Sequence, residues 1–295
     1  MSWPETVAER RILVFAVILG LVMAGWVFYA ARTAWLKHWE ERERRRPKPD
    51  TPFYAGAAPP TGAYVFALGV GALQAAEYEE LVDQLEYTRS KKRAQALLTE
   101  HGGDKARASL PRMLRALLGG DAEEPASGIA LVEAALRQRM TVGPELWTHA
   151  LEQFATTRGL SYGERHSLLA LAVDIGRAED RLRLEGLLGP TEMIPSLLAC
   201  HWAVGVHVVR CALRAGWLAP TQGYEYLARA GELTAKWYPT WSTVLGAQLL
   251  PALLSDDAQE LVWQLPVARR LLSDGPSPLR VPLRAVSAWP DRGNP

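Results

Sequence analysis

Hydrophobic residues form one unbroken block near the start of the chain and then recur at helical spacing almost to its end. Residues 12–31, ILVFAVILGLVMAGWVFYAA, include no charged side chain. At about 1.5 Å of rise per residue, a helix of this length matches the roughly 30 Å hydrocarbon core of a bilayer. Over residues 63–283 the apolar positions follow the helical period, and no segment alternates with period two over a useful length. The pattern predicts an all-α protein, with one N-terminal transmembrane helix followed by an orthogonal multi-helix bundle.

Proline and charge patterns divide the chain further. Pro47 and Pro49 end a charged helical extension of the apolar block, and the stretch after them is rich in Pro, Gly and Ala without a period, which is typical of an extended tether. The predicted parts are a short N-terminal segment (1–11), the transmembrane helix (12–31), a basic juxtamembrane helix with a Pro/Gly-rich tether (32–62), the helical domain (63–283) and a disordered tail (284–295).

Eleven helices are expected in the domain because apolar residues recur three and four positions apart between breakers. They cover residues 63–74, 77–98, 109–118, 128–139, 144–154, 163–173, 179–188, 195–215, 224–237, 241–254 and 258–272. The segment 195–215 is nearly all apolar, so it should be the buried centre, with Gly216 as its C-cap.

The apolar block has the features of a retained anchor. A cleaved signal peptide is the alternative, but its hydrophobic region would span about 7–15 residues and end in a small-x-small site. This block is longer and runs into Trp26, Phe28 and Tyr29. Ala16, Gly20 and Ala24 recur every fourth residue, so that face could also support a homodimer; the alternative is that Gly and Ala are simply common in membrane helices.

Basic residues on the two sides of the block predict its orientation. Arg10 and Arg11 precede it, whereas seven Lys and Arg residues follow it within residues 32–48. The positive-inside rule then places the C-terminal domain in the cytoplasm. Five residues of this basic run are also expected to contact anionic lipid headgroups: Arg42, Arg44, Arg45, Arg46 and Lys48.

Composition narrows the class of partner and the redox environment. The 295 residues carry a net charge of only +1, which argues against nucleic-acid binding by bulk electrostatics. The two cysteines, Cys200 and Cys211, would stand about 16 Å apart on one helix, far beyond the roughly 7 Å that a disulfide bridges. The absence of a disulfide framework fits a cytoplasmic domain.

Several stretches resemble a known family. FALGVGAL at 66–73, LLTEHGG at 97–103, HWAVGVHVVRCALRAGWL at 201–218, YEYLARAGEL at 224–233 and SPLRVPL at 277–283 are similar to the bacterial domain-of-unknown-function family 1266. The resemblance covers about residues 63–283 and implies a helical, mostly cytoplasmic bacterial protein, without an established activity. Trp202 matches the family's Trp-Asp-x-x-Arg pattern, but Ala203 and Val206 replace its Asp and Arg, so chemistry that needs that polar pair would be lost here.

No residues are predicted as catalytic, cofactor-binding or metal-binding. Cys200, His207 and Cys211 share one stripe of a helix, but a second Cys or His pair that could complete a tetrahedral site is missing, so core packing is the preferred interpretation. The sequence has no Gly-x-Ser-x-Gly elbow. Gly69 and Gly71 form at most a weak phosphate-loop signal, since no strand precedes them.

Tryptophan is abundant, with eleven in the chain. Aromatic residues often line protein-binding grooves, although core packing is the alternative for each of them. The candidates for partner binding are Trp202, Trp217, Trp237 and Trp241.

These features lead to two functional hypotheses from different classes. The first is a non-catalytic helical interaction module, single-pass in the bacterial inner membrane, acting as an adaptor or as an immunity or regulatory partner of a secreted toxin. The alternative is an enzyme of unrecognised type that acts on a lipid or small molecule at the cytoplasmic membrane face. The first is preferred because converging titratable groups are not evident in the sequence.

Overall fold

The computed structural model describes residues 52–61, 64–85, 90–102, 106–118 and 127–283. Over these ranges the regular structure consists of α-helices and a 3-10 turn, and extended pairing is limited to an isolated bridge between Phe53 and Leu81. The predicted all-α class is therefore confirmed for the described part of the chain. None of its helices has the length and apolar character needed to cross a bilayer. The predicted span at 12–31 and the predicted tail at 284–295 lie outside the described residues.

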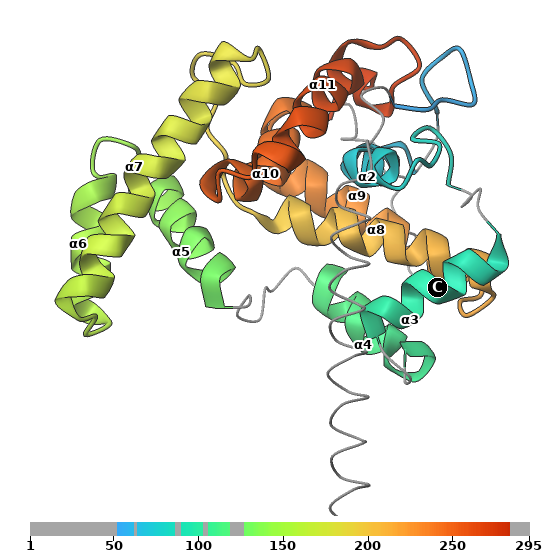
Figure 1. Ribbon diagram of the computed structural model, residues 1–295, viewed down its shortest axis with the longest axis horizontal. Coiled ribbons are helices and arrows are strands. Elements are labelled where there is room, and N and C mark those ends of the chain that lie inside the picture. The colour runs from blue at the N-terminus through green and yellow to red at the C-terminus, as the bar shows by residue number, and fades with distance from the viewer. Residues whose placement is uncertain (1–51, 62–63, 86–89, 103–105, 119–126, 284–295) are drawn as a thin grey trace, which may run out of the picture. The chain divides into compact units, whose positions relative to one another are not determined.

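Helix α8 lies at the centre of the bundle, and α2, α3, α4, α9 and α10 all pack on it (Figure 1). This confirms the buried centre expected from the apolar run. The helices are α2 (Val65–Glu77), α3 (Lys91–Gly102), α4 (Ala106–Leu118), α5 (Ser127–Val142), α6 (Trp147–Thr157), α7 (Tyr162–Leu184), α8 (Leu198–Ala215), α9 (Pro220–Trp237), α10 (Trp241–Leu254), α11 (Ala258–Ser273) and the 3-10 turn η2 (Pro278–Arg280).

Helix α8 ends as the sequence predicted. Gly216 has φ +72° and ψ +29°, the left-handed conformation that glycine adopts without steric cost. The N–H of Trp217 then donates to the carbonyl of Ala212 at 2.9 Å, which satisfies one of the last helical acceptors.

Helix α2 approaches its neighbours closely through two glycines. A Cβ added at Gly69 would lie 2.3 Å from the Trp241 ring, and one at Gly71 would lie 2.7 Å from Cγ1 of Val206. Real Cβ contacts are essentially never this short, so a side chain at either position would force the Trp241 ring or Val206 to shift. This role replaces the weak phosphate-loop interpretation of the same residues.

Two predicted helix boundaries are wrong for different reasons. The expected helix 77–98 is not formed as one element: α2 ends at Glu77, Glu79 adopts φ +56°, and the next helix, α3, begins at Lys91. Beyond this break, the Arg210 guanidinium donates to the carbonyls of Leu81 and Leu85, at 2.9 and 3.3 Å, so tertiary contacts replace helical hydrogen bonds. Conversely, the two helices expected at 163–173 and 179–188 form the single helix α7, because the intervening Gly176 is tolerated inside it.

Part of the predicted tether is docked on the domain. The Phe53 carbonyl accepts the N–H of Val82 at 3.0 Å, and the N–H groups of Ala55 and Gly56 both donate to the Asp83 carboxylate at 2.8–2.9 Å. Tyr54 donates its hydroxyl to Asp274 at 3.3 Å. Residues 52–56 are therefore held by specific contacts, which corrects the expectation of a free extended tether up to residue 62.

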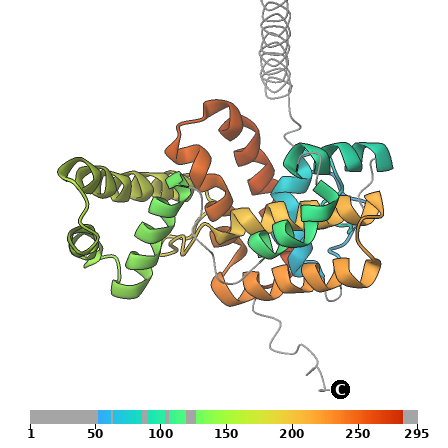
Figure 2. The ribbon, with the colours of Figure 1, turned by 90° about the horizontal axis from the view of Figure 1, so that it is seen from below.

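Helices α5, α6 and α7 pack on one another and form a three-helix lobe beside the other helices (Figure 2). The lobe contacts the remaining helices mainly through packing of α7 on α10. Its second connection is the segment that leads from α7 into α8, which is buried from Ile194 onward, and polar side chains concentrate at this buried part.

The docked segment generates the first prediction. Replacing Asp83 with alanine removes the acceptor of two backbone N–H groups, so we expect a loss of about 1 kcal/mol in unfolding free energy and faster proteolysis within residues 52–61. Chemical denaturation and limited proteolysis with mass spectrometry measure the two effects. Asp174→Ala, which removes only an exposed ion pair with Arg177, is the matched control. Equal unfolding free energies and equal proteolysis rates in the two variants would contradict the docking of residues 52–56.

Candidate functional site

The densest group of polar contacts in the described residues surrounds the start of α8. Glu133 of α5 is buried, and its carboxylate accepts the Ser196 hydroxyl and the Leu197 N–H, each at 2.7 Å. Arg137 donates to the same carboxylate at 2.8 Å. Glu133 thus supplies the negative charge and the acceptors that the N-terminus of α8 requires, although it lies 64 positions earlier in the chain.

A buried ion pair holds Ile194, which lies shortly before the start of α8. Arg139 and Glu179 form a two-pronged contact at 2.7 and 2.9 Å, and both side chains are 3 % exposed. Glu179 also accepts the N–H of Ile194 at 2.7 Å, while Arg139 donates to the carbonyl of the same residue at 2.9 Å. The Arg139 guanidinium lies 4.7 Å from the ring centroid of Trp147. Both charges are therefore compensated inside the protein.

Tyr238, which follows α9, completes the arrangement. Its hydroxyl donates to the Ser196 carbonyl at 2.7 Å and accepts the Ala199 N–H at 3.0 Å. Its ring meets Trp202 edge-on, with centroids 5.8 Å apart. The start of α8 is thus fixed from α5, α7 and the end of α9 together. We call the set Glu133, Arg139, Glu179, Ser196 and Tyr238 the junction cluster.

Burial shifts the pKa of Tyr238 and of two more titratable groups of this region, Cys200 and His201. Burial raises the pKa of the Cys200 thiol to about 12, and the negative charge of Glu133 adds to the effect. Burial also raises the pKa of Tyr238 well above its usual range and lowers the pKa of His201, against an opposing effect of Glu133. All three side chains are therefore neutral near pH 7, so Cys200 is not activated as a nucleophile.

The hydrogen bonds and ion pairs of the junction cluster serve the fold. The Glu133 and Glu179 oxygens accept donors from the backbone, from arginine and, at Glu133, from the Ser196 hydroxyl. The Ser196 hydroxyl also accepts a backbone N–H, and Tyr238 bonds to backbone groups. A general base needs a lone pair directed at a substrate, and a nucleophile needs a neighbouring base. The junction cluster is therefore a structural clamp, a set of side chains that holds the start of α8 in place.

The stripe formed by Cys200, His207 and Cys211 separates into two environments. Cys200 donates to the Ala247 carbonyl at 3.2 Å, whereas His207 lies 3.6 Å from Sγ of Cys211 and stacks on Tyr78 at 4.1 Å between centroids. In the described part of the chain, groups of three or more His, Cys, Asp or Glu placed to hold a metal are not found. His207 and Cys211 are buried, and Cys200 is partly exposed.

The four candidate tryptophans have different environments. Trp202 is fully buried, and Trp241 is 5 % exposed and donates to the Val281 carbonyl at 2.7 Å. The partner-binding prediction is therefore corrected for these two, because their rings fill the core. Trp217 and Trp237 are half-buried, and Arg137 lies 5.9 Å from the Trp237 ring. The prediction stays open for these two.

The remaining candidates lie outside the described residues. They are the headgroup-contact residues Arg42, Arg44, Arg45, Arg46 and Lys48 and the helix-pairing residues Ala16, Gly20 and Ala24. Both interpretations stay predictions.

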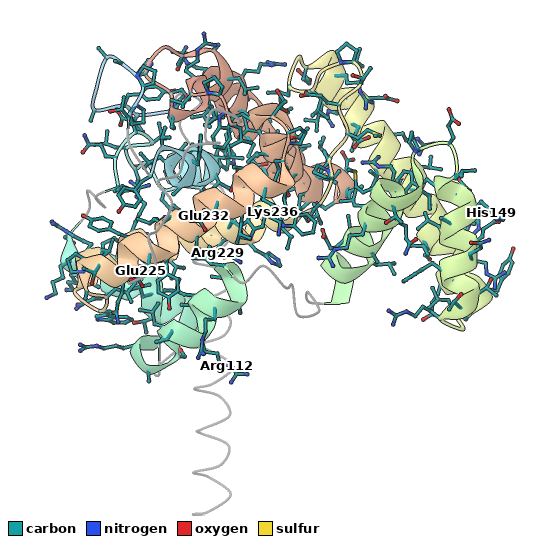
Figure 3. All side chains as sticks on the ribbon, turned by 180° about the vertical axis from the view of Figure 1, so that it is seen from behind. Arg112, His149, Glu225, Arg229, Glu232 and Lys236 are labelled. Carbon is teal, nitrogen blue, oxygen red and sulfur yellow. The ribbon has the colours of Figure 1, made fainter. Side chains whose placement is uncertain are left out.

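A row of alternating charges covers the outer side of α9. Glu225, Arg229, Glu232 and Lys236 follow one another along this helix (Figure 3), and Arg229 and Glu232 approach to 3.9 Å. Alternation of sign prevents a concentrated field, which is typical of a solvated helix face.

Helix α7 carries three exposed apolar side chains in line, which the sequence analysis missed. Tyr162, Val173 and Leu184 are 87 %, 53 % and 90 % exposed, and they recur every eleven residues, which keeps them in line along a helix. Leu168, Ile175 and Leu182 are fully buried on the opposite side. We define the outer face of α7 as Tyr162, His166, Ala170, Val173, Gly176, Arg177, Asp180 and Leu184. The eleven-residue spacing was available in the sequence, but a predicted break inside α7 concealed it.

The junction cluster also had a sequence signal. Glu179 continues the inward series of Leu168, Ala172 and Ile175 at spacings of four and three, and Arg139 extends the apolar face of α5 in the same way. A charged residue at an inward position implies a buried partner. No feature of the neighbouring sequence identifies that partner.

Comparison with known proteins gives no further assignment. The chain matches no protein-family model, and no curated protein or solved structure is significantly similar to it. The resemblance to family 1266 accordingly stays a prediction, and function has to be argued from the residues.

The clamp role of Glu133 gives the second prediction. Glu133→Ala leaves the Ser196 hydroxyl and the Leu197 N–H without their acceptor in a buried site, so we expect a loss of about 3 kcal/mol in unfolding free energy. Denaturant unfolding followed by circular dichroism measures it. The control is Glu152→Ala on the exposed side of α6, which should stay within about 0.5 kcal/mol of the parent chain. A Glu133 variant as stable as this control would rule out the clamp.

The Cys200 environment predicts a specific pH dependence. Because the pKa of this thiol is raised in the folded state, its contribution to stability is complete below about pH 9 and is lost as the pH rises towards 12. The melting temperature of the parent chain should therefore fall more steeply above pH 9 than that of the Cys200→Ala variant. Alkylation by iodoacetamide at pH 8, followed by peptide mass spectrometry, should be slow at Cys200 in the folded chain and fast after denaturation. Rapid alkylation of the folded chain would show an activated thiolate.

Proposed function

We propose that this chain is a membrane-anchored helical protein-interaction module without catalytic activity. In this proposal residues 12–31 span the bacterial inner membrane once, and the C-terminal domain lies in the cytoplasm. The module acts as an adaptor, or as an immunity or regulatory partner of a secreted toxin. The uncharged apolar block and the excess of Lys and Arg after it support the anchor and its orientation.

The observation that carries the interaction role is the outer face of α7. Two large apolar side chains, Tyr162 and Leu184, are almost fully exposed, and Val173 lies in line between them. Scattered exposed apolar residues are ordinary, but apolar residues aligned opposite the buried side of a helix fit a groove or a second helix. By contrast, Glu133, Glu179 and Tyr238 serve the fold, as their contacts indicate.

The docked segment supports a position close to the membrane. Lys48 belongs to the basic run expected at the headgroups, and Pro52 already lies on the domain. Four residues at no more than about 3.6 Å each allow a separation of roughly 14 Å between these two points. The domain would therefore be held beside the bilayer, where its partners would be membrane proteins or proteins recruited there.

An enzyme acting at the cytoplasmic membrane face is the alternative proposal. The feature in its favour is the concentration of Cys200, His201 and Tyr238 at the start of α8, since burial shifts the pKa values of these three groups and active sites gather titratable groups of this kind. The contacts of Glu133 and Tyr238 and the neutral state of Cys200 make it the weaker of the two.

The experiment that tests the proposed function begins with localisation. The full chain should sediment with membranes and resist alkaline extraction, whereas residues 47–295, which keep the docked segment, should be soluble and strongly helical with a cooperative melt. A C-terminal reporter active only in the cytoplasm should be active in the full chain. Alkaline extraction of the full chain would contradict the anchor.

The interaction role is tested in the same membranes by photo-crosslinking. A photoreactive residue at position 184 should give discrete adducts, while the same residue at Val262, which is 74 % exposed on α11, should give few. A screen of the purified full chain for hydrolase and transferase activity tests the enzyme alternative. Turnover that is lost in His201→Ala, together with the absence of adducts at position 184, would overturn the interaction module.

A further inference from the structure

We propose that the outer face of α7 binds the same face of a second copy of this chain, with the two helices antiparallel and a two-fold axis at Val173. The inference rests on the proposed function and names one partner for it. It follows from the positions of residues on either side of Val173.

Apolar residues oppose each other in this arrangement. An antiparallel two-fold at Val173 brings together positions that are equally far from it in opposite directions. Tyr162 lies eleven positions before Val173 and Leu184 eleven positions after it, and both are almost fully exposed. Each end of the pairing therefore buries one aromatic and one aliphatic side chain, and Val173 packs against itself in the middle.

Two polar residues on the same face, His166 and Asp180, are also complementary. His166 and Asp180 lie seven positions on either side of Val173, so the imidazole of one copy faces the carboxylate of the other. Asp180 already contacts Arg183 at 2.7 Å, but its side chain is 75 % exposed and its carboxylate can accept a further donor. A parallel pairing would instead place Asp180 against Asp180, which like-charge repulsion disfavours.

Small residues allow the two backbones to approach near the axis. Ala170 and Gly176 lie three positions on either side of Val173 and would therefore face each other. A Cβ added at Gly176 would meet nothing within 4 Å, so this part of α7 is open in the described structure. Interaxial distances of about 8 Å require small residues of this kind at the contact.

The size of the contact indicates where the pairing would operate. A helix of 23 residues is about 34 Å long, and one helix face buries less than the roughly 1,600 Å² of a standard stable interface. A dimer in free solution would be weak. Attachment of both copies to one membrane raises their effective concentration, which makes such a contact sufficient.

The test uses disulfide cross-linking of the full chain in membranes. Val173→Cys should give a covalent dimer under mild oxidation, because a residue on a two-fold axis meets its own copy. Val262→Cys is the matched control; it is also an exposed valine, and it retains Cys200 and Cys211, so any native cross-link appears in both variants. We expect at least ten-fold more dimer for position 173. Equal yields would overturn the pairing.

Orientation is tested with Tyr162→Cys and Leu184→Cys carrying different tags. The antiparallel arrangement predicts a cross-link when the two variants are co-expressed and little when either is alone. Cross-linking of Tyr162→Cys to itself at the same yield would overturn the antiparallel geometry. Adducts of position 173 with a different protein, without the dimer, would overturn self-pairing and leave the interaction module standing. Recovery of the chain outside the membrane fraction would instead count against the anchor.

Discussion

Two buried carboxylates control the junction between the three-helix lobe and the central helices. Glu179 and Glu133 accept the backbone N–H groups of Ile194 and Leu197, on the segment that leads from α7 into α8. A buried charge is costly unless hydrogen bonds and an opposite charge compensate it, so the segment and the two carboxylates fix each other. Arg139 provides the opposite charge for Glu179, and the position of α8 relative to the lobe follows from these contacts.

This constraint also accounts for the chemistry of the region. Cys200, His201 and Tyr238 lie near Glu133, yet burial keeps them neutral, and the cysteine and tyrosine bond to backbone groups. A concentration of titratable residues is often a sign of catalysis. Here Tyr238 bonds to the backbone at the start of α8 and Cys200 donates to the Ala247 carbonyl of α10, and the role in recognition is proposed for the outer face of α7.

The docked segment and the outer face of α7 connect the fold to the proposed position at the membrane. Asp83 and Leu81 hold residues 53–56, so the domain begins immediately after the basic run that follows the apolar block. A domain held at a short distance meets its neighbours in a restricted geometry, and weak contacts through one helix face then gain importance. The self-complementary positions about Val173 suit such a contact.

The sequence by itself determined the helical class, the central place of α8, its glycine C-cap and most helix boundaries, because these features depend on local periodicity and on breaker residues. Only the tertiary structure decided that Trp202 and Trp241 fill the core, that residues 52–56 dock, and that α7 is one helix with an exposed outer face. The partners of Glu133 and Glu179 were equally hidden from the sequence. Such pairings join residues far apart in the chain, and their energy comes from burial that exists only after the helices have packed.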